Sequence, residues 1–223
     1  KPGMSSFAPG SSFPVLSPMP SLSVPCPPVG VLSPTLVPRV TPLAPVTDWM
    51  PEFDVASAYA VLHEIERRRA ASGWRPVGRK IGFTNRTLWP RYNVFLPMWA
   101  HVWEETVTQA PDGQATLSLA RTVEPRIEPE VVFKLKAPVP VGADARAALD
   151  CVEWIAPGFE IVQSHFPDWK FTAADCTAAF GLHGALVVGT PLAVTDRNRA
   201  VLAAVLPGFI LTLRRAGATI DTG

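Results

Sequence analysis

The distribution of apolar residues predicts a chain with more strands than helices after residue 54. Apolar residues recur every three to four positions over 54–69, which predicts a helix that Asp54 caps and that ends before Gly73. A shorter helix is predicted over 144–151. Strands are predicted where apolar residues alternate or cluster, over 77–83, 101–107, 115–119, 126–133, 152–162, 185–188 and 209–213. With neither a βαβ rhythm nor an internal repeat, the pattern is typical of an α+β domain built on a coiled mixed sheet.

The first 47 residues have a different composition. Twelve of the 25 prolines fall within the first 45 residues, and only Lys1 and Arg39 are charged before Asp48. Proline removes a backbone donor and fixes φ, so we expect an extended, disordered leader over 1–47 and a folded domain over 48–223. The leader lacks the continuous apolar stretch of a secretory signal. A misplaced start codon or an out-of-frame leader is the alternative to a functional tail.

Charge and cysteine content exclude several classes of function. The net charge of +1 gives no electrostatic basis for binding nucleic acid or an anionic membrane. The longest apolar run, 200–213, is interrupted by proline and glycine and is too short to span a bilayer. Cys26, Cys151 and Cys176 match no zinc or disulfide spacing. We therefore expect a reducing compartment, the cytoplasm.

Two glutamates are the most informative chemical feature. Glu128 and Glu130 stand two apart in a predicted strand, so their side chains should project from the same face. Like charges near a core are costly unless a cation lies between them. Glu160, on another apolar run, could supply a third ligand, and three carboxylates favour Mg²⁺ or Mn²⁺. The alternative is that Glu128 and Glu130 lie on the solvated face of an edge strand.

Four sequence blocks carry a family resemblance. They are VGRKIGFT at 77–84, EPRIEPE at 124–130, PGFEIV at 157–162 and DWK at 168–170. With these blocks in this order, the chain from Asp54 onward resembles the hydratase and decarboxylase branch of the fumarylacetoacetate hydrolase superfamily. This is the branch of 2-keto-4-pentenoate hydratase and 2-oxo-hexenedioate decarboxylase. The resemblance implies the coiled mixed β-sheet roll of the fumarylacetoacetate hydrolase C-terminal-domain type, and a possible homo-oligomer.

The resemblance also implies roles for individual residues. Glu128, Glu130 and Glu160 would be the metal ligands, with Mg²⁺ or Mn²⁺ as cofactor. Lys80 would be the catalytic lysine, acting as a proton shuttle or carboxylate anchor, whereas by itself its sequence position is that of a surface lysine.

Three further residues are candidates for binding the substrate. They are Arg126, Lys170 and His183. Each has an alternative: surface ion pairing for Arg126, closure of a turn for the segment with Lys170, and a structural contact for His183.

The implied function is a metal-dependent hydratase, a lyase that acts on a 2-oxo-enoate or 2-hydroxydienoate through a metal-stabilised enolate. Such enzymes serve the catabolism of aromatic-ring cleavage products, with a small 2-oxo acid as the substrate. A decarboxylase or tautomerase of the same superfamily and a catalytically silent fragment are the alternatives.

Two departures from the family weaken the hydratase interpretation. The hydratases' Asp-Asn-Ala-Ser run is replaced by the residues at 179–182, and their acidic residue near 96–99 is absent. Relatives also continue past the point matching 219–223, so we expect a sheet that is incomplete at the C-terminus.

Overall fold

The computed structural model describes residues 42–210 and 212–222. The helices are α1 (Val46–Trp49), α2 (Val55–Ala71), α3 (Trp89–Tyr92), α4 (Ala145–Asp150), α5 (Ala173–Ala178) and α6 (Arg199–Val205). The strands are β1 (Pro76–Gly82), β2 (Met98–Trp103), β3 (Val107–Gln109), β4 (Arg126–Leu135), β5 (Val152–Val162), β6 (His183–Val188), β7 (Leu192–Ala193), β8 (Thr212–Arg215) and β9 (Ala218–Thr222). Short 3₁₀ turns connect them; η2 (Glu104–Thr106) and η4 (Phe180–Leu182) matter below.

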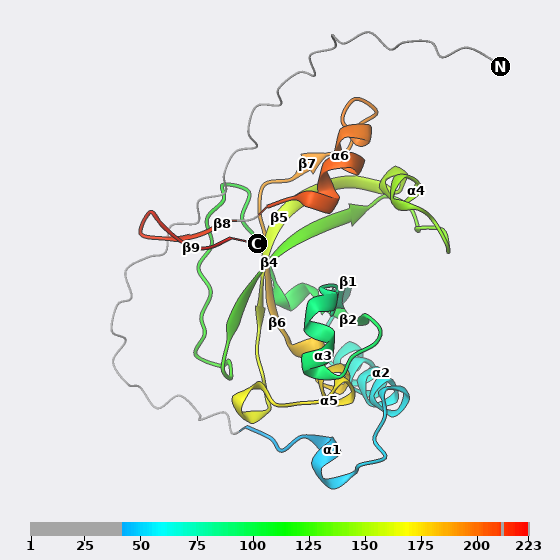
Figure 1. Cartoon of the computed structure of the whole chain (residues 1–223), viewed down its shortest axis with the longest axis vertical. Helices are drawn as coiled ribbons and strands as arrows, with labels where there is room; N and C mark the ends of the chain where they lie inside the picture. Colours follow the sequence, from blue (N-terminus) through cyan, green and yellow to red (C-terminus); the bar gives the residue numbers. More distant parts are fainter. Residues whose placement is uncertain (1–41, 211, 223) are drawn as a thin grey trace, which may run out of the picture.

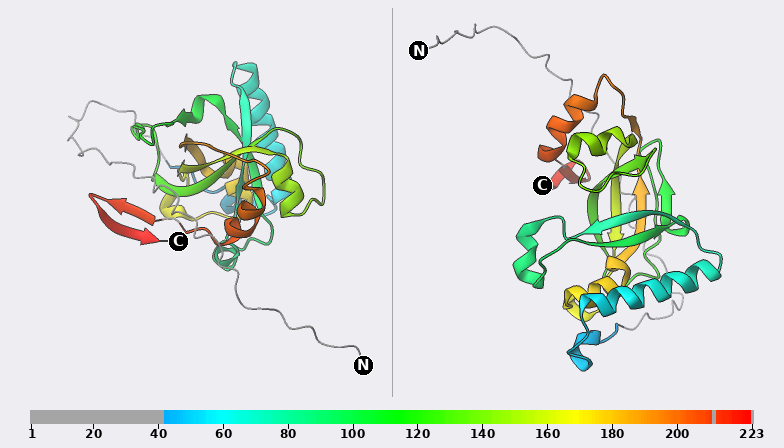
Figure 2. Two further views of the ribbon diagram at one scale, coloured as in Figure 1. Left: turned by 90° about the horizontal axis from the view of Figure 1, so that it is seen from above. Right: turned by 90° about the vertical axis from the view of Figure 1, so that its right-hand side faces the viewer.

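A mixed sheet forms the centre of the structure. Its strand order is β3-β6-β5-β4, and β7 pairs with the N-terminal end of β5, at Trp154 and Ile155. β3 and β6 are parallel, whereas β4, β5 and β6 pair antiparallel. β1 and β2 form a separate antiparallel ribbon, which crosses the sheet in Figure 2. The predicted combination of helices with a mixed multi-stranded sheet is therefore confirmed.

Helices pack at the two ends of this sheet. α4 and α6 lie together at one end and α2 and α5 at the other (Figures 1 and 2). The core at the first end is formed by Leu149, Val152, Ile155, Val194 and Leu202. The core at the second end includes Leu62, Met98, Ala100 and Phe180. Glu128, Glu130 and Glu160 lie on the neighbouring strands β4 and β5 of this sheet.

Several predicted elements are found with their expected bounds. α2 begins after Asp54, whose carboxylate accepts a hydrogen bond from the Ser57 N–H at 2.8 Å. β5 has the predicted bounds, Val152–Val162, and α4 lies within the predicted 144–151 segment. In each of these elements the local signals, a capping aspartate or a run of β-branched residues, agree with the tertiary packing.

Two strand predictions were wrong. The expected strand over 101–107 ends at Trp103, because η2 turns the chain before β3 begins. Residues 115–119 form no strand, although their apolar residues alternate. The nearby backbone hydrogen bonds close local turns, such as that from Gly113 N–H to Ala110 O and from Thr122 N–H to Leu119 O. Alternation of apolar and polar residues leads to a strand only where a neighbouring strand has free backbone groups with which the segment can pair.

The N-terminal part of the described chain packs on the domain. Leu43 N–H donates to the His165 carbonyl at 2.6 Å, and Thr47 Oγ1 donates to Asp175 Oδ2 at 2.7 Å. Residues 1–41 of the expected leader lie outside the described residues, so its disorder stays a prediction. β8 and β9 pair with each other in a sheet of their own, and the expected C-terminal incompleteness also stays a prediction. No helix in the described ranges is long and apolar enough to cross a membrane.

Candidate metal centre

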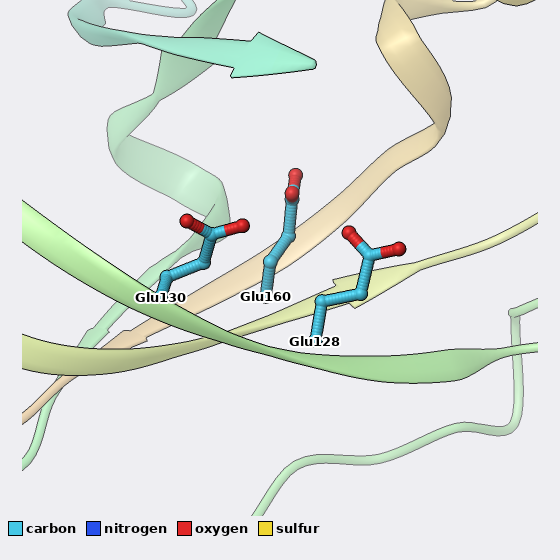
Figure 3. A group of neighbouring side chains, drawn as sticks. All are labelled: Glu128, Glu130 and Glu160. Atoms are coloured by element: carbon cyan, nitrogen blue, oxygen red, sulfur yellow. The ribbon is translucent and has the colours of Figure 1, made fainter. Parts of the chain in front are cut away.

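The pairing of β4 with β5 brings the three glutamates together. Glu128 lies directly opposite Glu160 in the antiparallel ladder, and Glu130 follows two residues later on the same face. One carboxylate oxygen from each residue lies within 4.8 Å of the others. Figure 3 shows the three carboxylates projecting from the same side of the strands. Glu128 is exposed, Glu130 is half-buried and Glu160 is buried, so the cluster opens to solvent on the Glu128 side.

Lys80 enters the cluster from the β1–β2 ribbon. Its Nζ donates to both oxygens of Glu160, at 2.8 and 2.7 Å, and to the carbonyl of Gly181 at 2.8 Å. These three acceptors match the three N–H donors of an ammonium group. The two side chains are 11% and 5% exposed, so this is a nearly buried ion pair. On the opposite face of β1, Ile81 is exposed, as the alternation of strand side chains predicts.

The Gly181 carbonyl reaches Lys80 through a left-handed turn. Phe180, Gly181 and Leu182 have φ angles of 58°, 58° and 64°. Such values are uncommon for residues other than glycine and persist where the surroundings hold them. A Cβ atom at Gly181 would lie 2.8 Å from Met98 Sδ and 3.4 Å from Lys80 Cε. Glycine therefore suits this left-handed position, where it leaves room for the Met98 side chain.

His183 follows this turn and contacts Glu160 from the other side. Its Nδ1 lies 2.6 Å from Glu160 Oε1, and its Nε2 lies 2.8 Å from Thr106 Oγ1. The His183 side chain is 2% exposed. The structure thus joins His183 to the glutamates. The contribution of Thr106 and that of the Gly181 backbone carbonyl had no signal in the sequence.

The electrostatic environment differs among the three carboxyl groups. Burial, together with the charges of Glu160 and Glu128, raises the pKa of Glu130 to about 7. The protein atoms around the Glu128 carboxylate exclude water and also raise its pKa, although the residue as a whole is exposed and the charge of Lys80 opposes the shift. For Glu160, burial would raise the pKa, but the hydrogen bonds and charges of His183 and Lys80 outweigh it and hold the pKa below its usual value. The negative charge of Glu160 is therefore balanced by neighbouring groups of the protein, whereas the carboxylates of Glu128 and Glu130 have no such hydrogen-bonded partner among the described residues.

The other two candidate substrate-binding residues lie outside this cluster of side chains. The Arg126 guanidinium lies 3.9 Å from the centre of the Trp169 ring, and its charge acts weakly on Glu128. The Lys170 side chain is 81% exposed and pairs with Asp168 at 3.4 Å. The structure places neither on the carboxylates. Their roles in substrate binding stay predictions.

The donor set fits a hard divalent cation. It consists of carboxylate oxygens alone, which magnesium and manganese prefer to sulfur ligands. The side-chain carboxylates of Glu128 and Glu130 accept no hydrogen bond from the residues that the structure describes, so their lone pairs are available to an ion. Burial and then the repulsion by Glu160 and Glu128 raise the pKa of Glu130, and a bound cation would relieve this repulsion.

Divalent-metal affinity is expected to fall about tenfold between pH 8 and pH 6. A metal binds the ionised carboxylate, and with a pKa of about 7 the ionised fraction of Glu130 falls from about nine tenths to about one tenth. Titration with Mn²⁺, followed by electron paramagnetic resonance of the free ion, measures the change. The Glu130→Gln variant serves as control, since its weaker residual affinity should depend less on pH. A wild-type affinity that stays constant over this range would contradict the assignment of Glu130.

Comparisons with curated proteins identify hydratases and decarboxylases as relatives, although no protein-family model matches the chain. The chain is 37% identical to 2-hydroxyhexa-2,4-dienoate hydratase of Comamonas testosteroni over 149 residues, which cover 66% of this chain and 56% of the relative. It is 32% identical to 2-hydroxypent-2,4-dienoate hydratase of Pseudomonas putida over 151 residues, 66% of each chain. It is 33% identical to 4-oxalocrotonate decarboxylase of Pseudomonas sp over 129 residues, 58% of this chain and 47% of the relative. The chain thus spans about half to two thirds of the length of these relatives.

A solved structure shares the fold. 4-Oxalocrotonate decarboxylase from Pseudomonas putida G7, complexed with magnesium and adipate, superimposes with a TM-score of 0.73 at 22% identity, over 82% of this chain and 67% of that one. The same enzyme complexed with calcium and acetate gives a TM-score of 0.71.

Proposed function

Because the chain belongs to the family of 2-keto-4-pentenoate hydratases and 4-oxalocrotonate decarboxylases, we propose that it is a metal-dependent lyase, a hydratase of a 2-hydroxydienoate or 2-oxo-enoate. The observation that carries this proposal is the cluster of three carboxylates, one of which, Glu160, accepts two hydrogen bonds from Lys80. Of the relatives described above, the one with the highest identity is a hydratase. The substrate class would place the enzyme in the catabolism of aromatic-ring cleavage products.

In this proposal Glu128, Glu130 and Glu160 hold Mg²⁺ or Mn²⁺. Support comes from the oxygen-only donor set and from the magnesium and calcium in the solved relatives. When bound, the ion would polarise the 2-oxo group of the substrate and stabilise the negative charge that develops there. The mixed sheet would be the coiled roll of the fumarylacetoacetate hydrolase C-terminal-domain type.

Lys80 would hold and move the proton at its Nζ atom. The three acceptors around Nζ bind the ammonium form and use all three of its hydrogens. Donation of a proton to the carbon skeleton next to the 2-oxo group would therefore require the substrate to replace one of these acceptors. Glu160 and the Gly181 carbonyl orient the ammonium, and the low exposure of the Lys80 side chain limits access of bulk water to it.

One observation favours a decarboxylase or tautomerase as the second candidate. Residues 179–182 supply only a backbone carbonyl to the site, and the Phe180 and Leu182 side chains are buried in the core. Adding water requires a group that activates the water molecule, whereas proton transfer or loss of carbon dioxide does not. A catalytically silent relative is the remaining alternative.

Turnover assays with the whole chain test this proposal. With Mg²⁺ present, the protein is expected to consume 2-hydroxypenta-2,4-dienoate, measured by loss of its ultraviolet absorbance, and a chelator should stop the reaction. Incorporation of ¹⁸O from labelled water into a new hydroxyl group on the carbon chain identifies a hydratase, while isomerisation without a new hydroxyl group identifies a tautomerase. Release of carbon dioxide from 2-oxohex-3-enedioate identifies a decarboxylase. A folded protein that consumes none of these substrates would be a silent relative.

The assembly and the location of the protein stay proposals. A homo-oligomer is supported by β4, a ten-residue edge strand that exposes Ile127, Phe133 and Leu135. The cytoplasm is supported by Cys151 and Cys176, which are free thiols.

A further inference from the structure

We propose that Thr106 is a positioning residue, which acts through His183 to fix the carboxylate of Glu160 for metal binding. The inference rests on the proposed metal site and adds to it a residue that does not touch the metal or the substrate. It starts from a chain of contacts that runs from the Trp103 carbonyl through Thr106 and His183 to Glu160.

The hydrogen-bond network assigns the direction of each bond in this chain. The Thr106 hydroxyl donates its single hydrogen to the Trp103 carbonyl at 2.8 Å. Its oxygen can therefore only accept from His183 Nε2, 2.8 Å away, so Nε2 carries a hydrogen. The Nδ1 atom faces a carboxylate oxygen at 2.6 Å, and a hydrogen must also lie between these two atoms. Thr106 thereby fixes the orientation of the ring that donates to Glu160.

The fold holds both ends of this chain in place. Thr106 ends η2, and the next residue, Val107, pairs with Leu186 in the parallel β3–β6 ladder. His183 opens β6 immediately after the left-handed turn at 180–182. The imidazole is almost completely buried, and both of its nitrogens have partners, which hold the ring in this orientation. The distance between the hydroxyl and the ring is therefore set by the register of the sheet.

The consequence is a difference among the three glutamates. Both oxygens of Glu160 are held by Lys80 and one also by His183, whereas Glu128 and Glu130 accept no hydrogen bond from the described part of the chain. Glu160 is the ligand whose carboxylate plane the protein fixes before an ion arrives. Loss of such an outer contact typically costs 10- to 100-fold in metal affinity.

Thr106→Val tests this role, because valine has nearly the same shape but neither donates nor accepts a hydrogen bond. We expect Mn²⁺ affinity to fall about 10- to 100-fold, with an altered resonance spectrum of the bound ion. Thr106→Ser should restore the affinity to within about threefold of wild type, because it keeps the hydroxyl. The matched control is Thr108→Val on β3. Thr108 is also half-buried, but its hydroxyl makes no hydrogen bond to the described residues. The Mn²⁺ affinity of the Thr108→Val protein should therefore equal that of wild type.

His183→Gln provides a second variant, and circular dichroism with thermal unfolding establishes that each variant is folded. The His183→Gln protein should lose Mn²⁺ affinity to a similar extent as Thr106→Val. Wild-type Mn²⁺ affinity in a folded Thr106→Val protein would overturn the inference and leave the proposed function intact. Equal losses in Thr106→Val, Thr106→Ser and Thr108→Val would show a general packing role and would also overturn it. Absence of Mn²⁺ binding by the wild type would overturn the proposed function and this inference together.

Discussion

Replacing Glu160 by glutamine is expected to lower the free energy of unfolding of the metal-free protein by about 3 kcal/mol, because it breaks a buried ion pair from one side. The Lys80 ammonium would remain in its nearly buried position without the carboxylate that accepts two of its hydrogen bonds. The hydrogen on His183 Nδ1 would face an amide instead of a charge. Urea denaturation at pH 8, followed by circular dichroism, measures the change.

The matched control is the same substitution at Glu130, where the opposite sign is expected. The pKa of Glu130 is raised to about 7, above the value near 4.5 of an unfolded chain. Its ionisation therefore destabilises the folded protein progressively as the pH rises from about 4.5 to 7. Glutamine does not ionise, so Glu130→Gln should raise the free energy of unfolding at pH 8 by about 1 to 3 kcal/mol, and this gain should vanish near pH 4.5. Equal destabilisation by both variants would contradict the charge distribution described above.

Replacing Lys80 by methionine is expected to lower the turnover number by about 10²- to 10⁴-fold, the usual contribution of a positioned acid or base. Methionine keeps the length of the side chain but has no proton to transfer. Mn²⁺ binding should weaken by about 10- to 100-fold, because Glu160 loses both hydrogen bonds from Lys80, but it should remain measurable because the three carboxylates remain. Steady-state kinetics with the preferred substrate, together with a Mn²⁺ titration of the same sample, separate the two effects.

Lys134→Met is the control for this variant. Lys134 lies on β4 with its side chain exposed, so its loss should leave the turnover number within about twofold of wild type. A Lys80→Met protein that binds Mn²⁺ and turns over within threefold of wild type would remove Lys80 from the mechanism.

The sequence predicted part of the site well, and the reasons are physical. The two-residue period of a strand is enough to place Glu128 and Glu130 on one face. The position of Glu160 opposite Glu128 depends on the register of β4 against β5, which a single sequence does not specify. Lys80 was identified through the family resemblance, since its own surroundings in the sequence are those of an ordinary strand lysine.

The remaining contacts could not have been predicted because they depend on three-dimensional turns. The Gly181 carbonyl reaches Lys80 only through three successive left-handed residues. Thr106 meets His183 only because η2 interrupts what the sequence predicts as one continuous strand. The failed strand prediction over 101–107 and the missed role of Thr106 therefore have the same cause.

Titration of the whole chain with Mn²⁺, in the presence and absence of oxalate, tests whether Glu128, Glu130 and Glu160 form a metal site for a 2-oxo acid. Oxalate has the charge and the paired oxygens of the enolate of a 2-oxo acid. We expect saturable binding of one ion per chain, at least tenfold tighter with oxalate, and much weaker binding of the ion, with or without oxalate, in Glu130→Gln. Absence of saturable binding by folded wild-type protein, or binding that Glu130→Gln leaves unchanged, would contradict the assignment of this metal site.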